Sequence, residues 1–77
     1  MIERSRPFTK EVVAREIQRI ELEILSTQRV YLRSMEELRA RPESELEQES
    51  TTRVHRASME ALKERLEFLE GMHSRLP

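Results

Sequence analysis

Residues 39–47 read Arg-Ala-Arg-Pro-Glu-Ser-Glu-Leu-Glu, and this segment decides how the chain folds. Pro42 has no backbone N–H and its ring clashes with a preceding helical turn, so it ends one helix or begins the next. Ser44 and Glu47 have the S-x-x-E spacing of a capping box, in which two side chains satisfy free N–H groups at a helix start. We therefore predict a turn over about residues 40–44, between helices at about 10–40 and 45–75.

This break allows two architectures. A short connection between helices folds the second helix back antiparallel to the first, as a hairpin. The alternative is one continuous helix of about 60 residues, kinked at Pro42. Because both capping signals stand beside the proline, we favour the hairpin. The chain then divides into an N-terminal arm at residues 1–8 and a single all-α helical-hairpin domain at residues 9–77.

Upstream of the break, seam residues alternate four and three positions apart, which is typical of a coiled-coil-like helix. Thr9 is the expected N-cap, because its hydroxyl can accept from a first-turn N–H. The seam consists of Val13, Ile17, Ile20, Ile24, Thr27, Tyr31, Ser34 and Leu38. Tyr31 is expected to face the polar stretch near Arg53, with its hydroxyl reaching a polar group at the edge of the bundle. Leu25, Leu32 and Met35 widen the apolar face, so this helix is expected to contact two neighbours.

Downstream of the break, the apolar pattern is uneven. Residues 45–53 contain only one apolar residue, Leu46, and then the four-three spacing returns. The second seam consists of His55, Met59, Leu62, Leu66, Leu69, His73 and Leu76, and a flanking stripe consists of Val54, Ala61, Phe68 and Met72. Gly71 is either the residue after the helix end or a tolerated interior glycine.

The antiparallel register follows from placing Leu38 opposite Leu46. Val13 then lies opposite Leu69, and Phe68 lies opposite Ile17. The apolar centre of the hairpin therefore falls away from the turn. We expect the turn end of the hairpin to be more exposed to solvent and to unfold locally more easily.

Composition excludes several classes of enzyme. The chain has no Cys and no Asp, which removes Cys nucleophiles and Asp-based triads, and one Gly cannot form a Gly-rich phosphate loop. The formal net charge is −1, so no overall field favours nucleic acid or a membrane. With no apolar run long enough for a membrane span and no signal-peptide pattern, a cytoplasmic location is expected. We expect no catalytic residues and no cofactor.

Two polar patterns suggest more specific sites. Four arginines, Arg15, Arg19, Arg29 and Arg33, fall on the outer face of the first helix and are candidates for contact with phosphate or with an acidic protein. Interleaved glutamates make a solvated, salt-bridged surface the alternative interpretation. Glu70 and His73 have the Glu-x-x-His spacing of helical metal sites, but one such pair supplies only two ligands. We therefore expect no metal.

A 77-residue chain without disulfides has a marginal core, so association with another chain is expected. The sequence predicts either a dimeric four-helix bundle of hairpins or a hairpin docked on a helical partner. The expected role is a protein–protein interaction module: an adaptor, a small chaperone-like subunit or a regulator. The alternative is a nucleic-acid-binding regulator that uses the outer arginines in a symmetric dimer. The expected association residues are Val13, Ile17, Ile20, Ile24, Tyr31, Leu38, Met59, Leu62, Leu66 and Leu69.

Overall fold

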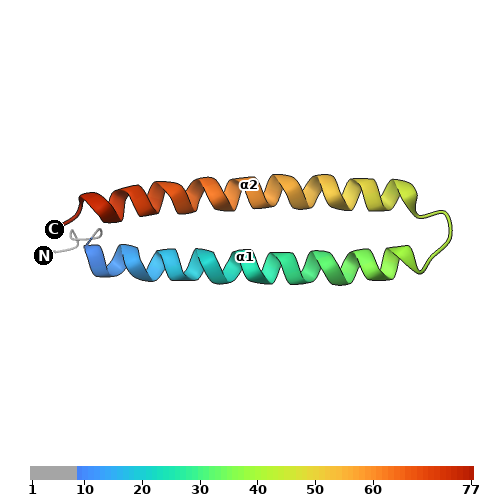
Figure 1. Ribbon diagram of the computed structural model, residues 1–77, viewed down its shortest axis with the longest axis horizontal. Helices are drawn as coiled ribbons and strands as arrows, with labels where there is room; N and C mark the ends of the chain where they lie inside the picture. The colour runs from blue at the N-terminus through green and yellow to red at the C-terminus, as the bar shows by residue number, and fades with distance from the viewer. Residues whose placement is uncertain (1–8) are drawn as a thin grey trace, which may run out of the picture.

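Two long helices lie side by side and antiparallel, joined by a short connection at one end of the hairpin (Figure 1). The structure is a computed structural model, and it describes residues 9–77. Helix α1 spans Lys10–Arg39 and helix α2 spans Glu45–Arg75. The hairpin predicted from Pro42 is confirmed and the single kinked helix is not. The arm predicted at residues 1–8 lies outside the described residues.

The helix ends follow local chemistry. The Thr9 hydroxyl accepts a hydrogen bond from the backbone N–H of Val12 at 3.1 Å, which confirms Thr9 as the N-cap of α1. Helix α2 continues to Arg75, so Gly71 is an interior helical residue rather than the residue that ends the helix. Neither α1 nor α2 contains a stretch that is apolar and long enough to cross a bilayer.

The connection uses Ser44 differently from the prediction. Ser44 is the N-cap of α2, but its side chain makes no capping hydrogen bond. Its hydroxyl instead donates to the backbone carbonyl of Leu38 and accepts from Nε2 of Gln48 at 2.9 Å. The capping box predicted from Ser44 and Glu47 is therefore wrong. The hydroxyl donates to the Leu38 carbonyl, which also accepts from the backbone N–H of Arg41 at 3.0 Å, and Glu47 pairs with the Arg41 side chain at 3.2 Å.

Ser44 is only 3% exposed, so its hydroxyl makes a buried hydrogen bond between the N-cap of α2 and the end of α1. We expect Ser44→Ala to lower the free energy of unfolding by about 1–2 kcal/mol, since it removes two hydrogen bonds at a buried position. Urea unfolding followed by circular dichroism measures this loss. Ser50→Ala, at an exposed position of the same helix, is the matched control and is expected to stay within about 0.5 kcal/mol. Equal losses in the two variants would contradict the role given to Ser44.

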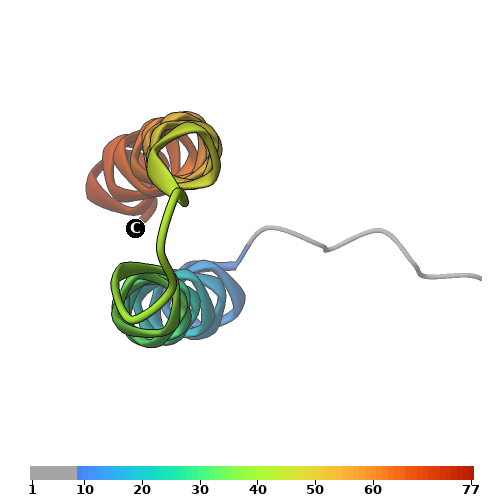
Figure 2. The same cartoon turned by 90° about the vertical axis from the view of Figure 1, so that its right-hand side faces the viewer.

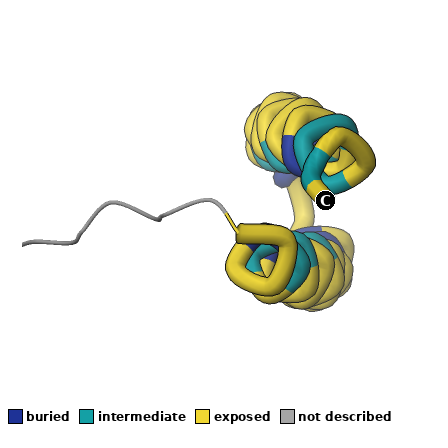
Figure 3. Tube along the Cα trace, turned by 90° about the vertical axis from the view of Figure 1, so that its left-hand side faces the viewer, coloured by how far each residue is buried: buried dark blue, intermediate teal, exposed yellow. Residues whose placement is uncertain are grey.

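The main core lies in the half of the hairpin away from the turn. Val13, Ile20 and Leu69 are 1%, 2% and 8% exposed. Partly buried side chains pack around them: Ile17, Ile24, Leu62, Leu66, Met72 and Leu76. Viewed along the hairpin, buried and intermediate positions face the space between the helices and exposed positions face outward (Figure 3). The two seams predicted from the four-three spacing therefore face each other in this half.

The half near the turn is held partly by polar contacts. The Tyr31 hydroxyl lies 2.9 Å from Oγ1 of Thr52, as expected for a polar partner on the second helix. The Tyr31 ring stacks on His55, with 4.0 Å between ring centroids and 10° between the planes. Met35 and Leu38 are also buried on α1, at 6% and 8% exposure. The view toward the turn shows the connection crossing directly between the two helix ends (Figure 2).

Two residues of the predicted register are misplaced. Leu46 is 81% exposed, so it does not face Leu38, and the Ser44 hydroxyl approaches the end of α1 instead. Phe68 is 61% exposed rather than packed opposite Ile17. The pairing of Val13 with Leu69 is correct, because both belong to the same buried cluster.

Candidate functional site

The predicted association residues are largely occupied within the hairpin itself. Those that are buried are Val13, Ile20, Leu38, Met59 and Leu69, and those that are half-buried are Ile17, Ile24, Tyr31, Leu62 and Leu66. Because α1 and α2 cover each other along this seam, the side chains that remain exposed lie on the flanks of the hairpin.

The flanks carry a substantial apolar surface. Eight large hydrophobic side chains of the described residues are exposed: Val12, Leu22, Leu25, Val30, Leu32, Leu46, Val54 and Phe68. The chain exposes 6241 Å² in total. A compact monomer of 9.2 kDa is expected to expose about 4,900 Å². The chain as a whole therefore exposes more surface than a compact protein of its mass.

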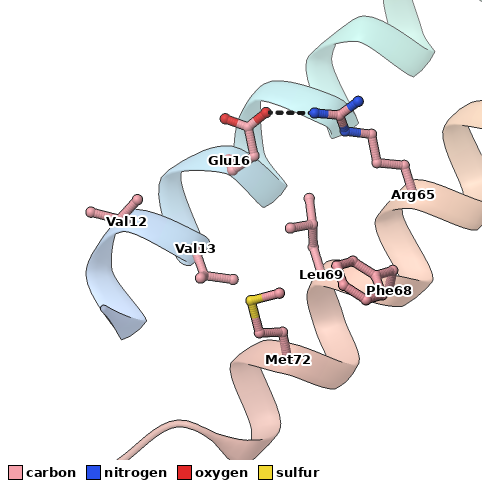
Figure 4. A pocket seen from close by; sticks show the side chains of 7 residues that line it. All are labelled: Val12, Val13, Glu16, Arg65, Phe68, Leu69 and Met72. Atoms are coloured by element: carbon pink, nitrogen blue, oxygen red, sulfur yellow. Dashed lines mark ion pairs between the residues drawn. The ribbon is translucent and has the colours of Figure 1, made fainter. Parts of the chain in front are cut away.

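One part of this surface is hollowed, at the end of the hairpin opposite the turn. The hollow has a volume of about 610 Å³ and is lined by Val12, Val13 and Glu16 of α1 and by Arg65, Phe68, Leu69 and Met72 of α2. We call it the terminal groove. Figure 4 shows the lining side chains, with Val13, Leu69 and Met72 pointing toward one another between the two helices. Because Val13 and Leu69 are core residues, the hairpin core forms one wall of the groove.

Two of the three exposed residues of the groove are apolar, and the third is Arg65. Val12 is 42% exposed on α1, and Phe68 is 61% exposed on α2. An exposed aromatic ring beside an apolar hollow is typical of interaction surfaces, where aromatic residues are enriched. The groove therefore offers a large side chain and a depression on the same face.

A charged pair spans the two helices at the groove (Figure 4). Oε2 of Glu16 lies 3.8 Å from Nη2 of Arg65 and 2.8 Å from Nη2 of Arg19. The hydrogen bond from Arg19, more than any other contact, lowers the pKa of the Glu16 carboxyl. Glu16 is therefore ionised at neutral pH. The Arg65 side chain is 62% exposed and its contact with Glu16 is long, so this contact holds the guanidinium only weakly.

The four arginines of the predicted outer face are exposed, but acidic side chains lie beside them. Arg15, Arg19, Arg29 and Arg33 are all exposed, as the helical spacing predicted. Arg19 is engaged by Glu16, which neutralises it locally. Arg29 and Arg33 line a shallow hollow of about 200 Å³ together with Val30, Ser34 and Glu37. This hollow thus combines two guanidinium groups with one carboxylate.

The histidines lie on the seam of α2. His55 is half-buried against Tyr31, and His73 is half-buried near the C-terminal end of the helix. Across residues 9–77, no three His or Glu side chains are grouped so that they could hold a metal ion. In this part of the chain, the Glu70 and His73 pair gains no third ligand.

The sequence pattern identified four of the seven groove residues, Val13, Phe68, Leu69 and Met72, but not the groove that they form. The seven-residue spacing of Val54, Ala61 and Phe68 marks a stripe beside the seam, and that stripe was the available signal. It does not say which residues of α1 stand across from it, and the structure supplies Val12 and Glu16. Comparison of this chain with protein-family models, with curated proteins and with solved structures gave no significant match.

Proposed function

We propose that this chain is a non-enzymatic protein–protein interaction module that acts through helix–helix packing. The terminal groove is the observation that carries the proposal. It is an apolar hollow with an exposed aromatic ring, built on the best-packed part of the hairpin. The role that fits such a surface is that of an adaptor, a small chaperone-like subunit or a regulator.

The energetics of a two-helix hairpin support this proposal. A chain of this size buries too little apolar surface to give a large free energy of unfolding. Small proteins compensate with disulfides, bound metal ions or association with another chain. This chain has no cysteine, so disulfides do not stabilise its fold. Burying the exposed side chains of the flanks against another helix contributes the missing apolar burial.

Nucleic-acid regulation is the second candidate, and Arg29 with Arg33 favours it. The two guanidinium groups lie on the same outer face of α1. Glu37 beside them and the pairing of Arg19 with Glu16 reduce the positive field that phosphate binding requires. Binding to duplex DNA or RNA that weakens steeply with salt, and is lost in Arg29→Gln/Arg33→Gln, would favour this candidate over the first.

The proposal predicts that the chain is not a stable monomer. We expect the melting temperature to rise with protein concentration between about 1 and about 100 µM, because association stabilises only the folded state. Circular dichroism melts and sedimentation at the same concentrations measure this together. A constant mass of 9.2 kDa with full helicity and a sharp, concentration-independent transition would contradict it.

A further inference from the structure

We propose that the terminal groove is the contact between two copies of this chain, related by a two-fold axis, with Phe68 of each copy filling the groove of the other. This inference rests on the proposed function and names its partner as a second identical hairpin. The result is a four-helix bundle in which Phe68 of each copy packs beside Val12 and Met72 of the other.

The shape of the surface supports a self-contact. A two-fold interface uses the same patch on both copies, so the patch has to contain both the protruding group and the hollow that receives it. The terminal groove meets this condition, since Phe68 is 61% exposed and lines a hollow of about 610 Å³. Aromatic side chains seated in such hollows are typical of the few residues that dominate binding.

The charges at the groove of one copy are complementary to those at the groove of a second copy. Glu16 is negative and Arg65 is positive, and they stand on opposite helices across the groove. A two-fold axis through the groove brings Glu16 of one copy toward Arg65 of the other, twice. Arg65 can turn to the second copy because its contact within the chain is 3.8 Å long, while Arg19 keeps Glu16 oriented at 2.8 Å. The pair adds no net charge, so two copies do not repel each other there.

The available area is also sufficient. The chain exposes 6241 Å² in total. A specific protein–protein interface of standard size covers about 800 Å² on each partner. The inferred contact thus requires about an eighth of the exposed surface, on the flank that contains Val12, Phe68 and Met72.

The first test compares Phe68→Glu with Leu46→Glu by sedimentation equilibrium. Leu46 is 81% exposed near the turn, far from the groove, and is the matched control. We expect wild type and Leu46→Glu to sediment at twice the chain mass of 9.2 kDa. Phe68→Glu is expected to raise the dissociation constant by about 30-fold or more, because it places a carboxylate in an apolar hollow. Equal dissociation constants for wild type and Phe68→Glu would overturn the inference.

A charge-swap experiment stays decisive even if Phe68→Glu folds poorly. Glu16→Arg and Arg65→Glu each create like charges within and between copies, so each variant alone is expected to dimerise at least about tenfold more weakly. An equimolar mixture restores both intermolecular pairs in the heterodimer. We therefore expect the mixture to form heterodimers that bind more tightly than either variant binds itself, measured by fluorescence anisotropy of one labelled variant. A mixture that associates no better than the separate variants would overturn the inference.

Failure of the inference is separable from failure of the proposed function. Suppose the dimer is dissociated by Leu25→Glu or Leu32→Glu but not by Phe68→Glu. The inference then falls and the interaction module stands, with its contact on another flank. A monomer that is only partly helical at every concentration would also overturn the inference. The interaction module would then require a partner other than a second copy of the chain. A fully helical, sharply melting monomer overturns both.

Discussion

Replacing Ile20 with glutamate is expected to abolish helicity and self-association together. Ile20 is 2% exposed and belongs to the buried cluster with Val13 and Leu69. A carboxylate placed there without a partner costs several kcal/mol. A chain of this length has a total stability of only about 4–12 kcal/mol. Far-UV circular dichroism and sedimentation of the variant measure both losses.

Leu22→Glu is the matched control for this prediction. Leu22 lies two residues further along α1 and is 66% exposed, so glutamate there stays in water. We expect its melting temperature to remain close to that of wild type, because substitutions at exposed helical positions change stability by about 0.5 kcal/mol or less. An Ile20→Glu variant with unchanged mass and melting temperature would show that Ile20 is not part of the core.

The helices and their pairing were predictable because their causes are local. Pro42 interrupts a helix by its covalent geometry, whatever the rest of the chain does. Thr9 caps α1 through a bond to Val12, three residues away. The four-three spacing fixes which side of each helix is apolar, and only one antiparallel register brings Val13 close to Leu69.

The errors concern choices that local spacing leaves open. The Ser44 hydroxyl had two possible uses, at the start of α2 or at the end of α1, and the backbone path of the turn decided between them. Glu43 adopts a positive φ of 58° in that turn, which spacing alone does not specify. Phe68 was misplaced because it belongs to the stripe beside the seam, whose members Val54 and Ala61 are also exposed. A flanking residue can thus face either the partner helix or the solvent.

The terminal groove was less predictable than the hairpin, since it joins residues far apart in the sequence. Glu16 and Arg65 approach to 3.8 Å only because the helices are antiparallel in this register. The spacing of the stripe predicts an apolar flank on α2 but not its counterpart on α1. The groove therefore depends on a tertiary arrangement, and the sequence pattern identified only Val13, Phe68, Leu69 and Met72 of its seven residues.

Amide hydrogens of residues 45–53 are expected to exchange at least about tenfold faster than those of residues 59–69, although both segments belong to α2. None of the apolar side chains in the first segment is buried, since Leu46 is 81% exposed. The second segment contains Met59 and Leu69, which are 7% and 8% exposed. Opening the second segment therefore exposes buried apolar surface that opening the first does not, at about 1.5–3 kcal/mol per buried side chain.

The hydrogen bond between Tyr31 and Thr52 allows a second test of this difference in exchange rate between the two segments. Thr52 lies in the segment expected to open first, and its hydroxyl is 2.9 Å from that of Tyr31. Tyr31→Phe removes this bond while keeping the ring that stacks on His55, so exchange should accelerate in residues 45–53 and remain unchanged in residues 59–69. Hydrogen exchange read by mass spectrometry resolves the two segments in both proteins. Equal protection of the two segments in the wild-type protein would mean that stability is distributed evenly along α2. It would then not depend on the apolar packing between Val13 and Leu69.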